Sequence, residues 1–311
     1  FSSFRTRLIE ETLAKEYSKQ EIRTPIHLSI GQEFTASAIC NFLDKDDFVI
    51  SHHRSHAHYL GKGGSLNRFI SELYGKVTGC SKGRGGSMHL TDMSAGFVAS
   101  TAIVSNSIPV GVGLSLSAKI LNKKQVTIIY LGDASVEEGV FFESLNFAIV
   151  KKLPVIFICE NNLYSVYSSL SSRQPKNRKI YKMVEGLGIK TINSEGNSTS
   201  AVTSSFLKAK DYVKKNDLPI FLEYQTYRWF EHCGPNKDDH LKYRSKAEVE
   251  FWKKKDPIKL LQNILFKKKL ISENSLNILK EKIKKRVNEA FNYAQRSPFP
   301  KEKDLNKYLY K

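Results

Sequence analysis

The sequence predicts an α/β fold in which a doubly wound, mostly parallel sheet carries helical additions at the N- and C-terminal ends of the chain. Two strand–helix–strand units support this prediction. The unit at 126–159 consists of the apolar run VTIIYL, the helical stretch EEGVFFESLNFAIVKK and the apolar run PVIFIC. The unit at 189–227 consists of IKTINS, TSSFLKAKDYVKK and PIFLEYQTY. A helix between two neighbouring strands implies parallel strands and a right-handed crossover.

The N-terminal third carries shorter signals. Residues 1–20 place apolar side chains at helical spacing and predict a helix, and GQEFTASAICNFL at 31–43 predicts a second one. FVISHHRSHAHYL at 48–60 begins as a short strand and continues into a histidine-rich segment. Glycine is dense from 61 to 100, which indicates ordered loops around a site instead of a packed element. The small residues of VGVGLSLSAKIL at 110–121 predict a helix that packs closely on the sheet.

The later segments complete the domain organisation. The polar stretch 165–182 is rich in Ser, Arg and Lys and predicts a mobile loop, and the chain beyond residue 245 reads mostly as helix. We therefore expect two parts. Residues 1–244 form the α/β domain, and residues 245–311 form a helical C-terminal extension.

The charge of the chain restricts the classes of partner. The formal net charge is +18, and the extension holds 18 Lys and Arg against 8 Asp and Glu, which makes it +10 by itself. Because this part lacks interleaved aromatic side chains and a DNA-reading helix motif, we interpret it as a solvated lysine-rich surface. Contact with an acidic partner protein is the second interpretation, and a nucleic-acid partner is not expected.

Cysteine spacing and hydropathy bear on the compartment. The four cysteines lie far apart with no CxxC pair, which indicates free thiols and neither a zinc site nor a disulfide framework. No run of about 18 apolar residues is present, so no membrane contact through a spanning helix is expected. The first residue is Phe1, so we expect a trimmed N-terminus. A cytoplasmic, bacterial-type location is expected, and an organellar one stays open.

Polar residues follow the two central strands where each strand ends. Asp133 follows the first strand, and Asn162 follows the second, 29 residues later. Taken alone, the Asp is typical of a helix cap and the Asn-Asn pair of a turn. Because the carboxyl ends of adjacent parallel strands share one edge, the two side chains are expected to face one point. A carboxylate and an amide oxygen with few protein charges favour Mg²⁺ that takes further ligands from phosphate and water.

Cations for such a phosphate are found in two segments. HHRSHAH at 52–58 contains Arg54, whose guanidinium offers a bidentate fork, and histidines that add donors. A surface histidine run is the alternative interpretation, and a zinc cluster is possible in principle, although no carboxylate or cysteine lies at familiar spacing. His232, in RWFEHCGP after a strand, is well placed to close over a phosphate tail.

Motifs along nearly the whole chain resemble one family. They are IGQEF, HHRSH, ELYGKVTGCSKGRGGSMHL, IVSNSIPVGVGLSLSAK, GDASVEEGVFFESLNFAIVKKLPVIFICENNLYS, TYRWFEH and YRSKAEVEFWKKKDPI. In this order they are similar to the alpha subunit of the thiamine diphosphate-dependent 2-oxo acid dehydrogenases, the decarboxylating component of pyruvate, branched-chain and acetoin dehydrogenase complexes. The GD…NN pair is the thiamine diphosphate signature of that family.

The resemblance implies a role for each matching position. Mg²⁺ would be bound by the side chains of Asp133 and Asn162 and by the backbone carbonyl of Tyr164. Expected catalytic residues are His56, which matches a histidine at the active-site mouth, and His232. The expected cofactor-binding residues are His53, Arg54, Ala102, Val104, Gly132, Asp133, Ala134, Ser135, Asn162, Tyr164 and His232. Of these, Ala102 and Val104 would meet the aminopyrimidine ring through backbone groups.

Some positions depart from the family pattern. Ala134 replaces the third glycine of the signature, a small change that still allows close approach, and His53 stands where a tyrosine is usual. Cys233 takes the place of a serine that mitochondrial members phosphorylate, while Ser168 and Ser169 lie in the other loop that such members use. Phosphorylation control at position 233 is therefore not expected.

Partners also follow from the resemblance. The glutamate that activates thiamine diphosphate belongs to a beta subunit, so the chain is expected to be inactive alone and to work as an α2β2 heterotetramer. It would decarboxylate a small 2-oxo acid, which the sequence does not identify, or act on acetoin, and pass the acyl group to a lipoyl-bearing acyltransferase. The alternatives are the diphosphate-binding half of a split transketolase, a non-catalytic scaffold descended from such a subunit, and a nucleic-acid-binding protein.

Overall fold

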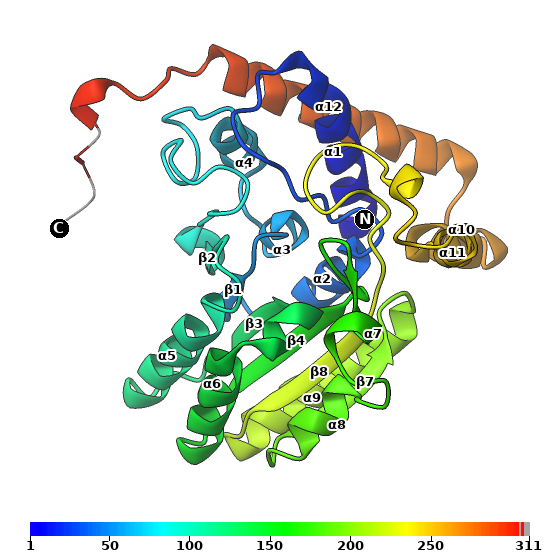
Figure 1. The fold of residues 1–311 in the computed structure, drawn as a ribbon. Coiled ribbons are helices and arrows are strands. Elements are labelled where there is room, and N and C mark those ends of the chain that lie inside the picture. Colours follow the sequence, from blue (N-terminus) through cyan, green and yellow to red (C-terminus); the bar gives the residue numbers. More distant parts are fainter. Residues whose placement is uncertain (305, 308–311) are drawn as a thin grey trace.

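The computed structural model describes residues 1–304 and 306–307, so the end of the predicted extension lies outside the described residues. Its centre is a six-stranded parallel sheet in the order β2-β1-β3-β4-β8-β7 (Figure 1). The strands are β1 (Phe48–Ser51), β2 (Phe97–Ser100), β3 (Thr127–Gly132), β4 (Val155–Asn161), β7 (Lys190–Glu195) and β8 (Ile220–Gln225). The predicted α/β fold class is confirmed.

Successive side chains of the central strands point to opposite faces of the sheet, and because both sets are apolar, the sheet has two apolar faces. On β3, Ile128 and Tyr130 join one core cluster, whereas Ile129 and Leu131 join the other. Helices cover both faces, as the doubly wound architecture requires (Figure 1). The second cluster includes residues of α5 (Ser107–Ile120), α6 (Gly139–Val150) and α8 (Ile180–Glu185). The first includes residues of α1 (Ser2–Glu16), α2 (Glu33–Cys40), α3 (His56–Gly61) and α9 (Thr199–Asn216).

Two segments contain more regular structure than the sequence predicts. The glycine-dense region expected to be loop includes α4 (Leu66–Leu73), because Phe69, Ile70 and Leu73 form an apolar stripe that is buried in the first core cluster. The expected loop 165–182 belongs to a short antiparallel hairpin and two short helices. These are β5 (Tyr164–Ser165), β6 (Ser168–Ser169), α7 (Leu170–Arg173) and α8.

The basic C-terminal part is helical, as predicted. Its helices are α10 (Lys246–Lys254), α11 (Pro257–Lys267) and α12 (Glu273–Arg296), and a side-chain oxygen caps each N-terminus. α12 runs along the outer side of α1 and α4 (Figure 1) and contributes Val287 and Ala290 to the same core cluster as those helices. Among the described residues, no helix combines the length and apolarity that a membrane crossing needs.

Candidate active site

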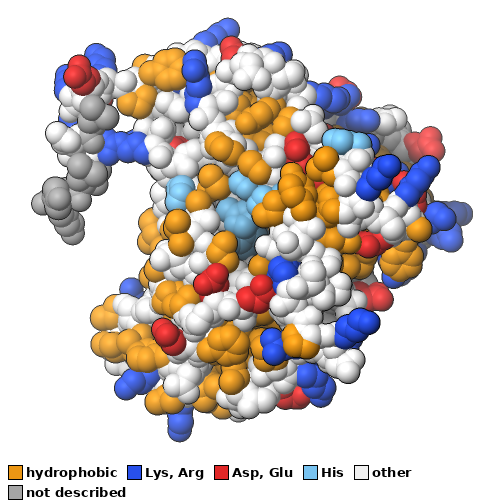
Figure 2. Space-filling model, in the orientation of Figure 1, with side chains coloured by type: hydrophobic (Ala, Val, Ile, Leu, Met, Phe, Trp, Pro, Cys, Tyr) orange, Lys and Arg blue, Asp and Glu red, His pale blue; other side chains and the backbone are white. Residues whose placement is uncertain are grey.

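A cavity of about 190 Å³ opens at the carboxyl edge of the sheet. Figure 2 shows histidine side chains gathered in a hollow of this face. The register of β3 and β4 pairs Gly132 with Glu160, so the residues that follow both strands meet at one place. The lining includes every residue that the sequence predicts to bind the cofactor: His53, Arg54, Ala102, Val104, Gly132, Asp133, Ala134, Ser135, Asn162, Tyr164 and His232.

The cavity lining includes the three residues that the sequence predicts to bind Mg²⁺, Asp133, Asn162 and Tyr164. Asp133 is 2% exposed, and its carboxylate forms an ion pair with Arg173. Burial raises the pKa of the Asp133 carboxyl, and the Arg173 guanidinium opposes that rise. Asn162 donates from Nδ2 to Gln32 Oε1 at 3.1 Å, and its Oδ1 accepts the backbone N–H of Tyr164 at 3.2 Å. The amide is thereby oriented with its nitrogen engaged and its oxygen able to accept a further contact.

Tyr164 contributes to this part of the lining through its backbone. Its side chain lies against the C-terminal extension, where the hydroxyl donates to Glu248 Oε2 at 2.9 Å. The residue starts the β5–β6 hairpin by pairing with Ser169. This placement is compatible with the predicted use of the Tyr164 carbonyl as a ligand, because the side chain is engaged elsewhere.

A buried guanidinium also lines the cavity. Arg54 is 2% exposed and donates to the carbonyl oxygens of Leu28 at 2.8 Å and His232 at 3.0 Å. Among the described residues no carboxylate forms an ion pair with Arg54. Burial, followed by the charge of Arg228, lowers the pKa of Arg54 to about 9. A buried positive charge without an anionic partner is costly, so this part of the lining favours an anionic ligand.

Three histidines stand beside Arg54 and form a mutual cluster. The ring centroid of His27 lies 4.8 Å from that of His53 and 5.1 Å from that of His232, and the centroids of His53 and His232 are 5.3 Å apart. Burial first, and then the charge of Arg54, lowers the pKa of His27 to about 2 and that of His232 to about 3. The imidazoles are therefore neutral near pH 7. Neutral imidazole N–H groups beside a fixed guanidinium can donate hydrogen bonds to phosphate oxygens. The positive charge of the guanidinium makes the cluster less suitable for a metal ion.

These histidines predict a stability loss in acid. The unfolded chain takes up protons near the ordinary histidine pKa of about 6.5, whereas folded His232 and His27 do so only near pH 3 and below. The contribution of these histidines to the free energy of unfolding is therefore complete above about pH 6.5. As the pH falls toward 3, the free energy of unfolding decreases by up to about 1.4 kcal/mol per pH unit for each histidine. Urea titrations from pH 7.5 to 4.5 measure the slope. His232→Gln should reduce the slope of the free energy of unfolding against pH. His89→Gln, which replaces an exposed histidine, should leave the slope unchanged, and a pH-independent free energy in the wild type would contradict the prediction.

The structure adds cavity residues to which the sequence analysis assigned no role. Glu160 is buried between His58 and His52, with Nε2–Oε2 distances of 3.3 and 3.6 Å, and accepts a hydrogen bond from Gln32 at 3.1 Å. Burial raises the pKa of Glu160, but the two histidines outweigh this effect and lower the pKa to about 2. His27 and Gln32 also line the cavity. The sequence signals that could have identified Gln32 and Glu160 are the motif IGQEF, which contains Gln32, and the position of Glu160 directly before Asn-Asn.

His56 does not lie at the cavity mouth, contrary to the position expected from the sequence. It is 0% exposed; its Nδ1 is 3.0 Å from Glu10 Oε1 and its Nε2 is 2.7 Å from Ser87 Oγ. The first turn of α3 directs the ring into the core, against Phe69. Because both ring nitrogens are engaged inside the protein, direct proton exchange with a ligand in the cavity is not available to them. His56 does not line this cavity, and its catalytic role stays a prediction.

The residues present fit a metal-bound diphosphate. A Cβ built on Gly132 would meet no atom within 4 Å, so the backbone at the end of β3 faces open space. Ser135 continues this backbone, and its carbonyl is held by Ser105 Oγ at 2.9 Å. The same lining holds carboxylate and amide oxygens of the kind that a hard cation prefers and a buried guanidinium that suits phosphate oxygens.

Comparisons with known proteins agree with the motifs. The family described as Dehydrogenase E1 component matches residues 3–303. The pyruvate dehydrogenase E1 component subunit alpha of Rickettsia bellii is 36% identical over 304 residues, which cover 98% of this chain and 92% of the relative. Its counterpart in Rickettsia felis has the same identity and coverage. The mitochondrial pyruvate dehydrogenase E1 alpha subunit of Pisum sativum is 34% identical over 316 residues, covering 99% of this chain and 78% of the relative. The chain therefore belongs to the dehydrogenase E1 component family of thiamine diphosphate-dependent enzymes, as its motifs predict.

Proposed function

We propose that the chain is the alpha subunit of a pyruvate dehydrogenase-type enzyme that uses Mg²⁺ and thiamine diphosphate to decarboxylate a small 2-oxo acid. The observation that supports this most is that Arg54, which is buried and forms no ion pair with a carboxylate among the described residues, lines the same cavity as Asp133 and Asn162. Pyruvate is the proposed substrate because the curated relatives carry that name. The alternative, one half of a split transketolase, is not favoured by the family match.

Each part of the cavity lining has a proposed role. Asp133, the Asn162 side chain and the Tyr164 backbone carbonyl would hold Mg²⁺, and Arg54 with His232 would hold diphosphate oxygens. The backbone of Gly132, Ala134 and Ser135 would approach the diphosphate. When bound, thiamine diphosphate supplies the carbanion-stabilising chemistry that decarboxylation requires. The protein contributes binding, orientation and the exclusion of water.

A beta subunit is proposed to complete the active site. The carboxylates in the described cavity lining are Asp133 and Glu160, and both already pair with cationic or histidine side chains. Neither is available to activate the cofactor ring, so the activating carboxylate would come from the partner. We propose an α2β2 heterotetramer that delivers its acyl product to a lipoyl-bearing acyltransferase. The proposed location is the cytoplasm, in view of the bacterial relatives.

The surface of α5 and α6 is compatible with a partner subunit. Apolar side chains gather at the lower left of Figure 2, over the place that α5 and α6 occupy in Figure 1. The exposed apolar residues of these helices are Val110, Ile120, Phe142, Phe147 and Val150. A contiguous apolar surface of this kind marks interaction sites.

Co-expression with a beta-like partner tests the function. The complex should reduce an artificial electron acceptor in the presence of thiamine diphosphate, Mg²⁺ and pyruvate, with CO₂ release, and a panel of branched 2-oxo acids and acetoin should rank below pyruvate. The chain alone should be inactive. Full decarboxylation by the isolated chain, or sugar-phosphate transfer without CO₂ release, would refute the proposal.

A further inference from the structure

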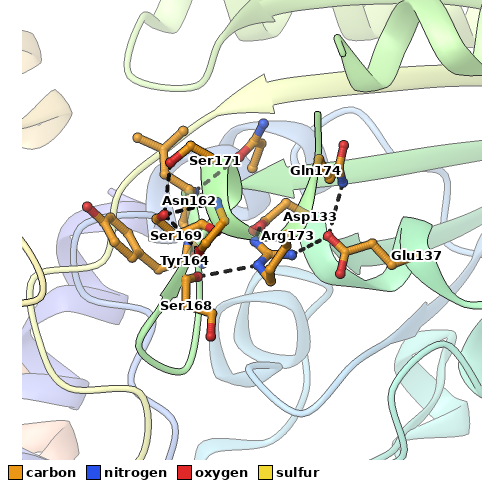
Figure 3. A network of polar contacts seen from close by, with 12 residues as sticks. Asp133, Glu137, Asn162, Tyr164, Ser168, Ser169, Ser171, Arg173 and Gln174 are labelled. Carbon is orange, nitrogen blue, oxygen red and sulfur yellow. Dashed lines mark hydrogen bonds and ion pairs between the residues drawn. The ribbon is translucent and has the colours of Figure 1, made fainter. Parts of the chain in front are cut away.

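Arg173 binds the predicted metal anchor from a neighbouring segment. It ends α7, and its Nη2 pairs with Asp133 Oδ2 while its Nη1 lies 2.5 Å from Glu137 Oε1 (Figure 3). Its Nε donates to the carbonyl of Ser168 at 3.3 Å. The guanidinium is therefore engaged on all sides, and its side chain is only 12% exposed.

The segment that carries Arg173, residues 164–174, is anchored at the same site by both ends. Tyr164 begins it and donates its backbone N–H to Asn162 Oδ1 at 3.2 Å. Gln174 ends it and donates to Glu137 Oε1 at 3.1 Å (Figure 3). Between them, the hairpin β5–β6 and the cap of α7 at Ser169 fix the path of the chain. We call residues 164–174 the arginine strap.

The guanidinium and a metal ion compete for one oxygen. Mg²⁺ needs a direct contact of about 2.0–2.1 Å to its carboxylate ligand. Nη2 of Arg173 already donates a hydrogen bond to Asp133 Oδ2. Two cations in a site where Asp133 is 2% exposed would also repel each other strongly, because water screens them little. A metal ion that binds Asp133 through Oδ2 must therefore displace Arg173 from that oxygen.

We propose that Arg173 is an internal counter-ion of the predicted metal anchor Asp133, and that binding of Mg²⁺ with the diphosphate moves α7 and Arg173 away from Asp133 while Tyr164, at the start of the arginine strap, stays at the metal. The inference rests on the proposed function, since it takes Asp133 as the metal ligand. Glu137 also gains a role, because its side chain is 31% exposed and can retain Gln174, at the end of the strap, when Arg173 leaves Asp133.

The structure offers room for this displacement. A cavity of about 640 Å³ lies beside the strap, lined by Ser169, Leu170, Ser171 and Gln174 among others. Tyr164 lines both this cavity and the cofactor cavity, so the strap forms part of the partition between them. Movement of α7 into this space would carry Arg173 away from Asp133 without unfolding the sheet.

Calorimetry on the full chain with its beta partner tests the proposal. Arg173→Gln should tighten thiamine diphosphate binding in the presence of Mg²⁺ about tenfold, because the ion pair no longer has to be broken. Arg178→Gln is the matched control: it removes an exposed arginine a few residues further on, with no acidic partner among the described residues, and should leave the dissociation constant unchanged. Unchanged or weaker binding in Arg173→Gln would overturn the proposal, weaker binding meaning that Arg173 contacts the diphosphate itself.

A second readout needs no cofactor. Mn²⁺ titrated into the complex and followed by electron paramagnetic resonance should bind about tenfold tighter to Arg173→Gln than to wild type, with Arg173→Lys between them. Equal Mn²⁺ affinity would overturn the inference even if thiamine diphosphate binds. If Mn²⁺ competes with Arg173 but thiamine diphosphate does not bind, the proposed function is refuted. The inference that Arg173 is a counter-ion displaced by metal still holds in that case. Hydrogen exchange at residues 168–174 should rise on metal addition; constant protection of these residues would contradict displacement of α7.

Discussion

Replacing Asp133 with alanine is expected to abolish Mg²⁺-dependent binding of thiamine diphosphate while the chain stays folded. The buried carboxylate is the only formally charged metal ligand predicted, so its loss removes most of the attraction for a dication. We expect the dissociation constant to rise about 100-fold or more, which corresponds to roughly 2.7 kcal/mol. Calorimetry on the assembled complex, with and without Mg²⁺, measures this change, and circular dichroism checks the fold.

Two further variants separate charge from shape. Asp133→Asn keeps an oxygen ligand in place and should retain weak, Mg²⁺-dependent binding. Glu138→Ala removes an exposed acid from the same turn and should bind normally. Unchanged affinity in Asp133→Ala would show that the metal is held elsewhere.

Replacing Arg54 with methionine is expected to have the second-largest effect. Arg54 is the buried cation of the cavity, and its charge has no carboxylate partner among the described residues, so a diphosphate would be its counter-ion. Losing charge-assisted hydrogen bonds in a desolvated site should weaken diphosphate binding by about 100- to 1,000-fold, or roughly 3–4 kcal/mol.

The measurement uses inorganic pyrophosphate and thiamine diphosphate in parallel. Both ligands should bind more weakly to Arg54→Met than to wild type. The affinity of Arg54→Lys should lie between those two, because a lysine keeps the positive charge but lacks the two parallel N–H donors of the guanidinium. Equal pyrophosphate affinity in wild type and Arg54→Met would rule out this role.

Local patterns were sufficient to predict the sheet and the meeting of Asp133 and Asn162 in one cavity. The apolar runs of β3 and β4 are buried along nearly their whole length, so they stand out against the polar connections around them. Given two adjacent parallel strands, the meeting of Asp133 and Asn162 follows from topology alone. The strand ends therefore carried most of the information about the candidate site.

Features that depend on tertiary packing were not predictable in the same way. The burial of His56 is set by Glu10 and Ser87, which lie far from it in the sequence. Arg173 stands in a polar stretch without periodicity, and only the folded chain brings it to Asp133, 40 residues away. Likewise, the stripe of α4 is short and surrounded by glycine, so its packing could not be read from composition.

Anomalous scattering from Mn²⁺ in crystals of the complex with thiamine diphosphate tests the central claim most directly. We predict a peak within coordination distance of Asp133 and the Asn162 side-chain oxygen, with the diphosphate against Arg54 and with Arg173 withdrawn from Asp133. A peak at another place, or a metal bound while Arg173 still pairs with Asp133, would contradict this account of the site.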